Sequence, residues 1–193
     1  MDDLATPLSA ACVAALPDED EVLAVRARTD REAFGVLYQR HAVAVYRYLR
    51  ARGASEDRAE DLTAAAFERA LRAIGGFRTG RAGFRPWLLA IARNAWVDSH
   101  RRASREAALD EAAALTATAA SPEAAAEAAE ERDLVMGLLA RLPEPARDAL
   151  ALRYAAGLSA REIAHVIGRS EDATKKLMSR SLESLREAAR HDR

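Results

Sequence analysis

Basic and small polar side chains near the C-terminus share one face of a predicted helix that begins after residue 170. At 100° per residue, this face carries Lys175, Lys176, Ser179 and Arg180, and the opposite face carries Thr174, Met178, Ser181 and Leu185. Cations and hydroxyls on one face suit the DNA major groove, while the other face packs on a partner helix. The pattern predicts a DNA-reading helix. The alternative is an ordinary helical hairpin with a solvated basic face.

The residues before this helix predict the rest of a helix-turn-helix. Ser159-Ala160-Arg161-Glu162 is a capping box, which marks the start of a helix. Gly168 ends that helix, and Ser170 caps the next one, whose first turn is acidic. Two capped helices separated by a three-residue turn form the helix-turn-helix layout.

A second group of candidate residues mixes aromatic rings with arginines. The rings are Phe77, Phe84, Trp87 and Trp96, and the cations among them are Arg78, Arg81, Arg85 and Arg93. Rings can stack on unpaired or extruded bases while arginines neutralise phosphates. The alternative places Phe84 and Trp87 in the core, because they share an apolar stripe with Leu88 on a predicted helix over 84–102. That helix also has a cationic side with Arg93, and Asn94 and Arg101 share one flank.

Charge is distributed in blocks, although the net charge is only -1. Residues 78–105 hold seven Arg against one acid, residues 106–133 hold eight acids against one Arg, and residues 153–190 hold eight bases against five acids. Two basic blocks with an acidic stretch between them favour two nucleic-acid-binding modules and a connector. An Arg-rich solvated surface is the simpler alternative for charge alone.

Composition favours an all-α fold with two small domains. Ala accounts for 47 of 193 residues and aromatics for 5%, which favours helices over a large β-structure. The first three helices are predicted over 18–52, 56–74 and 84–102, and four more follow from residue 131. The expected organisation is an N-terminal tail at 1–17, a helical domain at 18–102, a flexible acidic Ala-rich linker at 103–130 and a helix-turn-helix domain at 131–193.

Several classes of site and location are not expected. Cys12 is alone and the four His are scattered, so no disulfide, metal site or cofactor is predicted. No nucleophile–base pairing or phosphate loop points to an enzyme, and His41 lies on an apolar face that predicts a packed histidine. No apolar run approaches the roughly 20 residues of a membrane span, and the N-terminus is acidic. A cytoplasmic protein without membrane insertion is therefore expected.

With these residues in place, the chain resembles the bacterial sigma factors of RNA polymerase, specifically the extracytoplasmic-function (ECF) group. The resemblance covers most of the chain. In the first domain it is carried by Arg31-Glu32-Ala33-Phe34, Val45-Tyr46-Arg47-Tyr48-Leu49, Ala59-Glu60-Asp61-Leu62, Phe84-Arg85-Pro86-Trp87-Leu88 and Ile91-Ala92-Arg93-Asn94. In the second it is carried by Leu142-Pro143, Leu152-Arg153-Tyr154, Gly157-Leu158-Ser159 and Glu162-Ile163-Ala164.

The resemblance implies core RNA polymerase and promoter DNA as partners, and an anti-sigma factor that holds the protein. Polymerase binding would involve Asp61, Leu62 and Phe67. Recognition and melting of the minus-ten element would involve Phe77, Arg78, Arg81, Arg85, Trp87, Arg93, Asn94 and Arg101. Reading of the minus-thirty-five element would involve Arg153, Ser159, Arg161, Ser170, Lys175, Lys176, Ser179 and Arg180.

The chain departs from the family pattern at two places. Where the family usually has Val-Gln-Glu after Asp-Leu, this chain has Thr63-Ala64-Ala65, which removes two polar side chains from the expected polymerase contact. Leu177 stands where the family often has Arg in the recognition helix. The first departure supports an alternative function, a sigma-like DNA-binding regulator with weakened or lost polymerase binding.

Overall fold

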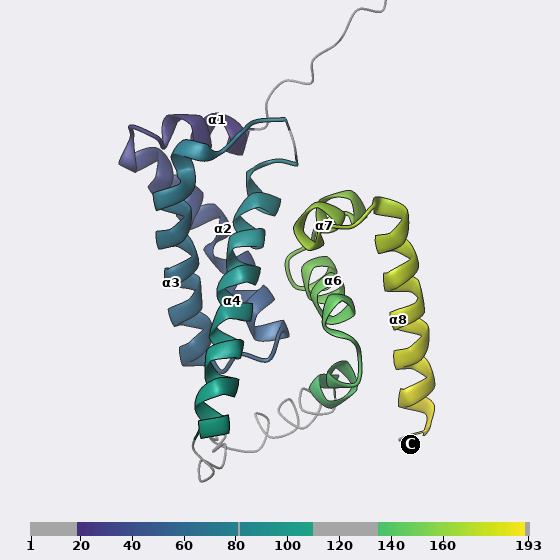
Figure 1. Ribbon diagram of the computed structural model, residues 1–193. Coiled ribbons are helices and arrows are strands. Elements are labelled where there is room, and N and C mark those ends of the chain that lie inside the picture. The colour runs from purple at the N-terminus through teal and green to yellow at the C-terminus, as the bar shows by residue number, and fades with distance from the viewer. Residues whose placement is uncertain (1–18, 81, 110–134, 192–193) are drawn as a thin grey trace, which may run out of the picture.

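The computed structural model describes residues 19–80, 82–109 and 135–191, and every regular element in these ranges is a helix (Figure 1). The expected all-α fold is therefore confirmed for this part of the chain. The tail at 1–17, Arg81 and most of the expected linker lie outside the described residues.

The N-terminal domain is a bundle of helices in which α2, α3 and α4 run alongside one another and α1 lies across one end (Figure 1). Its elements are α1 (Glu19–Arg26), α2 (Arg31–Ala51), α3 (Glu56–Ala73), the short 3-10 helix η1 (Ile74–Gly76) and α4 (Phe84–Leu109). The apolar stripes of α2, α3 and α4 meet in the core, where Leu37, Phe67 and Leu88 are each at most 3% exposed.

Two predicted helix boundaries in this domain were wrong. The single helix expected over 18–52 is two helices, because Asp30 caps a new one by accepting hydrogen bonds from the amides of Glu32 and Ala33. The helix expected to end at 102 continues to Leu109. Ala and Glu in residues 103–109 are strong helix formers, which favours continuation of the helix.

The C-terminal domain contains a helical segment at 135–140, then α6 (Glu144–Tyr154), α7 (Ala160–Ile167) and α8 (Glu171–His191). The predicted capping box is present: Ser159 Oγ accepts from the Glu162 amide at 3.3 Å, and the Ser159 amide donates to Glu162 Oε2 at 2.7 Å. Gly168 ends α7 with φ of 68°, a left-handed conformation that favours glycine. Ser170 then caps α8 by accepting from the Ala173 amide.

The two domains pack against each other along α4 and α7, with a smaller contact between α2 and α6 (Figure 1). The C-terminal domain has a core of its own between α6 and α8, built on Leu142, Ala146 and Leu150. Other residues of α6 and α7 belong to an apolar cluster that continues into the N-terminal domain, among them Leu152 and Ile163. The chain therefore adopts a closed arrangement of two helical domains.

Candidate nucleic-acid interface

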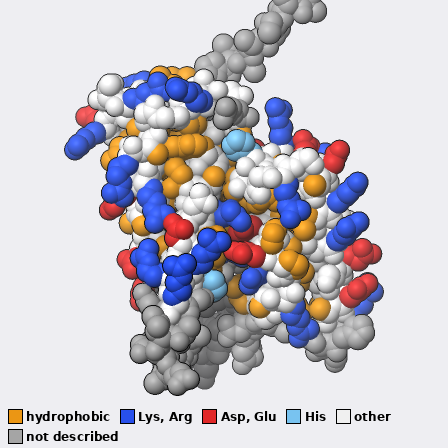
Figure 2. Space-filling model, viewed as in Figure 1, with side chains coloured by type: hydrophobic (Ala, Val, Ile, Leu, Met, Phe, Trp, Pro, Cys, Tyr) orange, Lys and Arg blue, Asp and Glu red, His pale blue; other side chains and the backbone are white. Residues whose placement is uncertain are grey.

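The basic face of α8 is exposed, as the sequence predicted. Lys175, Lys176, Ser179 and Arg180 are all exposed, and Figure 2 shows Lys and Arg side chains along the outer edge of α8, interspersed with acids. On the opposite face Thr174 is 0% and Ser181 5% exposed. Their hydroxyls donate to the carbonyls of Ser170 and Leu177, so both buried polar groups are satisfied. The helix therefore packs on one face and presents its cations on the other.

The remaining residues predicted for minus-thirty-five contacts lie near the two ends of α7. Arg161 and Ser170 are exposed, and Ser159 shares its hydroxyl with the capping box. Arg153 donates to the Leu158 carbonyl at 3.0 Å, which ties the end of α6 to the loop before α7. Leu177 is half-buried and packs against the core, so it supports the fold of α8 instead of extending its basic face.

The aromatic residues around 77–96 belong mostly to the core. Phe77 is 2%, Phe84 0% and Trp96 6% exposed, and Trp87 is half-buried. Phe77 packs its ring on Phe84 and Trp87, with centroids 5.9 and 5.4 Å away. The base contact expected of Phe77 does not fit this position, because stacking on DNA would require its ring to leave the core.

The loop between η1 and α4 is fastened to α1 and to the turn that follows it. Arg28 Nη2 donates to the Phe77 carbonyl at 2.7 Å, and Glu21 accepts from the Gly80 amide at 3.0 Å. Gly80 and Gly83 have φ of 78° and 87°, which few other residues adopt without strain. The loop is thus held in a turned conformation, and it presents Arg78 to solvent.

Of the polar residues on α4 that were predicted to contact DNA, two are exposed and two are hydrogen-bonded to the C-terminal domain. Asn94 and Arg101 are exposed, and Figure 2 shows basic side chains gathered over the lower part of α4. Arg85 instead donates to the carbonyl of Ala156, and Arg93 donates to Asp148 at 2.6 Å. Both acceptors belong to the C-terminal domain. In the closed chain the expected minus-ten surface is therefore partly covered.

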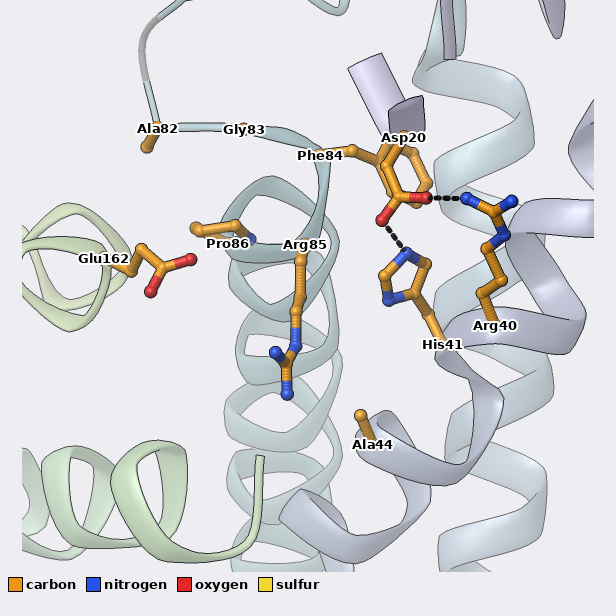
Figure 3. Close-up of a pocket in the computed structure, with 10 residues that line it drawn as sticks. All are labelled: Asp20, Arg40, His41, Ala44, Ala82, Gly83, Phe84, Arg85, Pro86 and Glu162. Carbon is orange, nitrogen blue, oxygen red and sulfur yellow. Dashed lines mark hydrogen bonds and ion pairs between the residues drawn. The ribbon is translucent and has the colours of Figure 1, made fainter. Parts of the chain in front are cut away.

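A cleft of about 380 Å³ opens between the two domains beside Arg85 (Figure 3). Glu162 of α7 faces it from one side, and Asp20, Arg40 and His41 line the other side. Asp20 forms an ion pair with Arg40 at 2.9 Å and a hydrogen bond with His41 Nε2 at 2.8 Å. His41 is 6% exposed, and this burial lowers its pKa although Asp20 opposes the change. His41 is thus a packed residue, as its apolar surroundings in the sequence predicted.

Three residues were expected to bind polymerase through α3, and the structure separates them. Asp61 is exposed, whereas Leu62 and Phe67 are 8% and 3% exposed and lie in the core. Phe67 packs against Tyr38 and Phe34. Leu62 and Phe67 therefore pack α3 onto the core, and Asp61 is the residue of the three whose side chain reaches solvent. Ala64, one of the departures from the family pattern, is exposed on the same helix.

Sequence reasoning missed a buried polar cluster between the domains. Asp148 on α6 is 0% exposed and accepts from Tyr48 Oη at 2.9 Å and Arg93 Nε at 2.6 Å. Arg52 Nε forms an ion pair with the same carboxylate at 2.7 Å. Burial, together with the Asp148 charge, raises the pKa of Tyr48 well above its ordinary value. The available signal was an acid directly before the apolar run from Ala149 to Leu152.

Within the described ranges no group of three or more His, Cys, Asp or Glu is arranged to hold a metal ion. No helix there is long and apolar enough to span a bilayer.

Comparisons with known proteins agree with these features. A family model described as Sigma-70 region 2 matches residues 37–106, and one described as Sigma-70 region 4 matches residues 132–185. The ECF RNA polymerase sigma factor BldN of Streptomyces coelicolor is 35% identical over 159 residues, which are 81% of this chain and 60% of BldN. The chain thus spans 60% of the length of this relative.

Two further proteins match over nearly their whole length. The RNA polymerase sigma factor NccH of Alcaligenes xylosoxydans xylosoxydans is 34% identical over 171 residues, which are 86% of this chain and 91% of NccH. The solved structure of CnrH in complex with the cytosolic domain of CnrY aligns with a TM-score of 0.71 at 28% identity. That alignment covers 91% of this chain and 100% of CnrH, so it includes both domains.

The fold and the exposed basic helix define a two-domain, all-helical protein of the DNA-binding class. With both Sigma-70 regions present and NccH 34% identical over 91% of its length, the chain belongs to the sigma factors of bacterial RNA polymerase, in the ECF group. Sigma factors direct promoter-specific initiation of transcription.

Proposed function

We propose that this chain binds core RNA polymerase and directs it to promoters, reading the minus-thirty-five element with α8 and opening the minus-ten element with the N-terminal domain. The observation that carries the proposal is the exposed basic face of α8, set in a capped helix-turn-helix in the same chain as a Sigma-70 region 2. Such a face positions cations for base edges and phosphates. The protein itself performs no bond chemistry in this role, and it works in the cytoplasm, where the polymerase is.

The residues proposed for each contact follow from their exposure. For minus-thirty-five DNA they are Lys175, Lys176, Ser179 and Arg180 on α8, with Arg153, Ser159, Arg161 and Ser170 as phosphate contacts. For minus-ten DNA they are Arg78, Asn94 and Arg101, which are exposed, and Arg85, Trp87 and Arg93 once the domains separate. For polymerase the proposed contact is the exposed part of α3 around Asp61.

An anti-sigma protein is the further proposed partner. The CnrH structure was solved with the cytosolic domain of CnrY, and another solved sigma factor, RpoE of Bartonella quintana, with the anti-sigma factor NepR. By similarity we expect a protein of this kind to bind the chain across one or both domains.

The direct test is a pull-down of the purified chain with bacterial core RNA polymerase, followed by run-off transcription on genomic fragments. Stable binding and new start sites are expected. Asp61→Ala should weaken the pull-down, and Glu68→Ala, an exposed acid two turns along α3, is the matched control. A chain that binds DNA but not polymerase would overturn the proposal and favour the regulator, for which the exposed Ala64 is the structural argument.

A further inference from the structure

Asp148 is an acid of the C-terminal domain whose side-chain partners, among the described residues, lie in the N-terminal domain. Its Oδ1 contacts Tyr48 Oη at 2.9 Å and Arg52 Nε at 2.7 Å, and its Oδ2 contacts Arg93 Nε at 2.6 Å. Both carboxylate oxygens are therefore engaged across the domain boundary. We refer to Tyr48, Arg52 and Arg93 together as the arginine pocket.

The arginine pocket depends on the C-terminal domain for its counter-charge. The Arg52 side chain is 2% exposed, and its two acidic partners in the described part of the chain, Asp148 and Glu144, both lie on α6. A buried guanidinium without an anion is strongly unfavourable. Removing one partner of a buried ion pair therefore destabilises a protein far more than replacing both partners by apolar groups. If the domains separate, the pocket must therefore rehydrate or take another anion.

The position of the arginine pocket indicates which anion would replace the Asp148 carboxylate. Arg93 lies on α4, the helix that also presents Asn94 and Arg101 to solvent on the proposed minus-ten surface. Two guanidiniums and a phenol hold a phosphodiester as well as they hold a carboxylate, because both anions offer paired oxygen acceptors. We infer that Asp148 is an internal competitor of promoter DNA: its carboxylate occupies the arginine pocket in the closed chain, and a backbone phosphate of DNA occupies it in the open chain. This inference rests on the proposed function.

Closure affects the two DNA-binding surfaces differently. On the minus-ten side, Arg85 is bonded to the Ala156 carbonyl, and His165 of α7 faces Phe77 and Trp87 across a cavity of about 150 Å³. On the minus-thirty-five side, the basic face of α8 remains exposed. The closed chain can thus approach duplex DNA through α8 while part of its melting surface stays covered.

The test measures binding of the full-length chain to a fluorescein-labelled, mixed-sequence single-stranded oligonucleotide, since phosphate contacts do not depend on sequence. Asp148→Asn keeps the side-chain volume and removes the competing charge. It should tighten binding about tenfold if the open form rises from about a tenth of the population to most of it. Small-angle scattering should show a larger radius of gyration without DNA. Asp98→Asn, which removes an exposed α4 acid paired with Arg69, is the matched control for net charge.

A second substitution separates a phosphate site from a mere domain lock. Asp148→Asn combined with Arg52→Gln should return the affinity to the wild-type value or below and reduce the salt slope by about one. If the arginine pocket only holds the domains together, the double variant keeps the tight binding of Asp148→Asn, and the phosphate assignment is overturned. An Asp148→Asn protein with unchanged affinity and unchanged radius overturns the competition itself.

Folding and the proposed function are checked separately. If circular dichroism shows that Asp148→Asn is unfolded, Glu144→Gln replaces it, because this change weakens the link between α6 and Arg52 and leaves every group of the arginine pocket in place. It should shift affinity and radius in the same direction by a smaller amount, and a folded Glu144→Gln protein with wild-type values overturns the inference. Failure of wild-type run-off transcription would instead overturn the proposed function, since the radius and the oligonucleotide affinity are measured without polymerase.

Discussion

Lys175 Nζ lies 2.6 Å from Glu171 Oε1, one turn earlier on the exposed face of α8. Their side chains are 57% and 43% exposed, and the contact raises the pKa of Lys175 and lowers that of Glu171. A lysine proposed to contact minus-thirty-five DNA is thus already paired with an acid of its own helix. When DNA binds, either Glu171 moves away from Lys175, or its negative charge stays close to the DNA phosphates.

Glu171→Gln should therefore strengthen binding to a minus-thirty-five duplex. The change releases the Lys175 ammonium and removes a charge that repels phosphate, and the gain should not exceed about fivefold because exposed ion pairs are weak. Fluorescence anisotropy of the holoenzyme on the duplex measures it. Glu183→Gln, an exposed acid on the same helix, controls for net charge. Equal gains in both variants would show that the Lys175–Glu171 pair has no specific effect.

Lys175→Ala and Arg180→Ala should each weaken minus-thirty-five binding and leave polymerase binding intact. A cation that contacts phosphate contributes about one to the salt slope, and one that contacts a base edge contributes about 1–3 kcal/mol. Footprinting and affinity at several salt concentrations, with core polymerase in excess, measure both quantities. Arg72→Ala on α3, whose side chain is 72% exposed, is the control. Loss of polymerase binding in either α8 variant would contradict the division of labour between the domains.

The fold could be predicted from sequence wherever a local signal dictated it. The capping box at Ser159 and the Gly168 end of α7 follow from short-range rules, and so does the buried stripe through Thr174. The start of a new helix after Asp30 was not predicted, because the apolar pattern of α2 was extended back past its N-cap. Asp is nevertheless a strong capping residue. Arg-rich composition at 77–93 also concealed that Phe77 is a core residue.

The arrangement of the domains could not be predicted in the same way. Arg93 and Asp148 lie 55 positions apart, and no periodicity relates residues on two separately folded helices. The resemblance predicted a DNA contact for Arg93 but gave no indication that Asp148 would pair with it. The acid directly before the apolar run of α6 was the available signal, and its meaning depends on the partner domain.

Ser159→Ala should destabilise the C-terminal domain by about 1 kcal/mol, the usual cost of removing a helix N-cap. Ser159 Oγ both accepts from the Glu162 amide and donates to Glu162 Oε2, so the change removes both hydroxyl bonds, while the Ser159 amide can still donate to Glu162 Oε2. Urea unfolding measures the loss, and Ser159→Thr should retain most of the stability because Thr also caps. If Ser159→Ala weakens DNA binding without changing stability, the hydroxyl contacts phosphate directly instead of acting through the helix start.

Phe77→Ala and Arg78→Ala change neighbouring positions, but the first should lower stability and the second should impair promoter opening. Phe77 is 2% exposed and packs on Phe84 and Trp87, so its truncation should cost about 3–5 kcal/mol of unfolding free energy. Arg78 is exposed, so its truncation should leave stability unchanged and reduce promoter opening. Thermal unfolding and permanganate footprinting of the holoenzyme distinguish the two. A stable Phe77→Ala protein with impaired opening would restore Phe77 to the melting surface.

Stability should fall as the pH drops below 6.5, in part because of His41. Burial lowers the pKa of His41 below its ordinary value of 6.5, against the opposing charge of Asp20. Below pH 6.5 the unfolded chain takes up a proton that the folded chain does not, so the free energy of unfolding decreases until the pH reaches the folded-state pKa. Urea unfolding across this range should show a smaller pH dependence for His41→Gln, with His165→Gln, an exposed histidine on α7, as the control. A pH dependence that is the same in wild type and His41→Gln would mean that folding leaves the pKa of His41 unchanged, and a steeper loss of stability in His41→Gln would mean that Asp20 raises it.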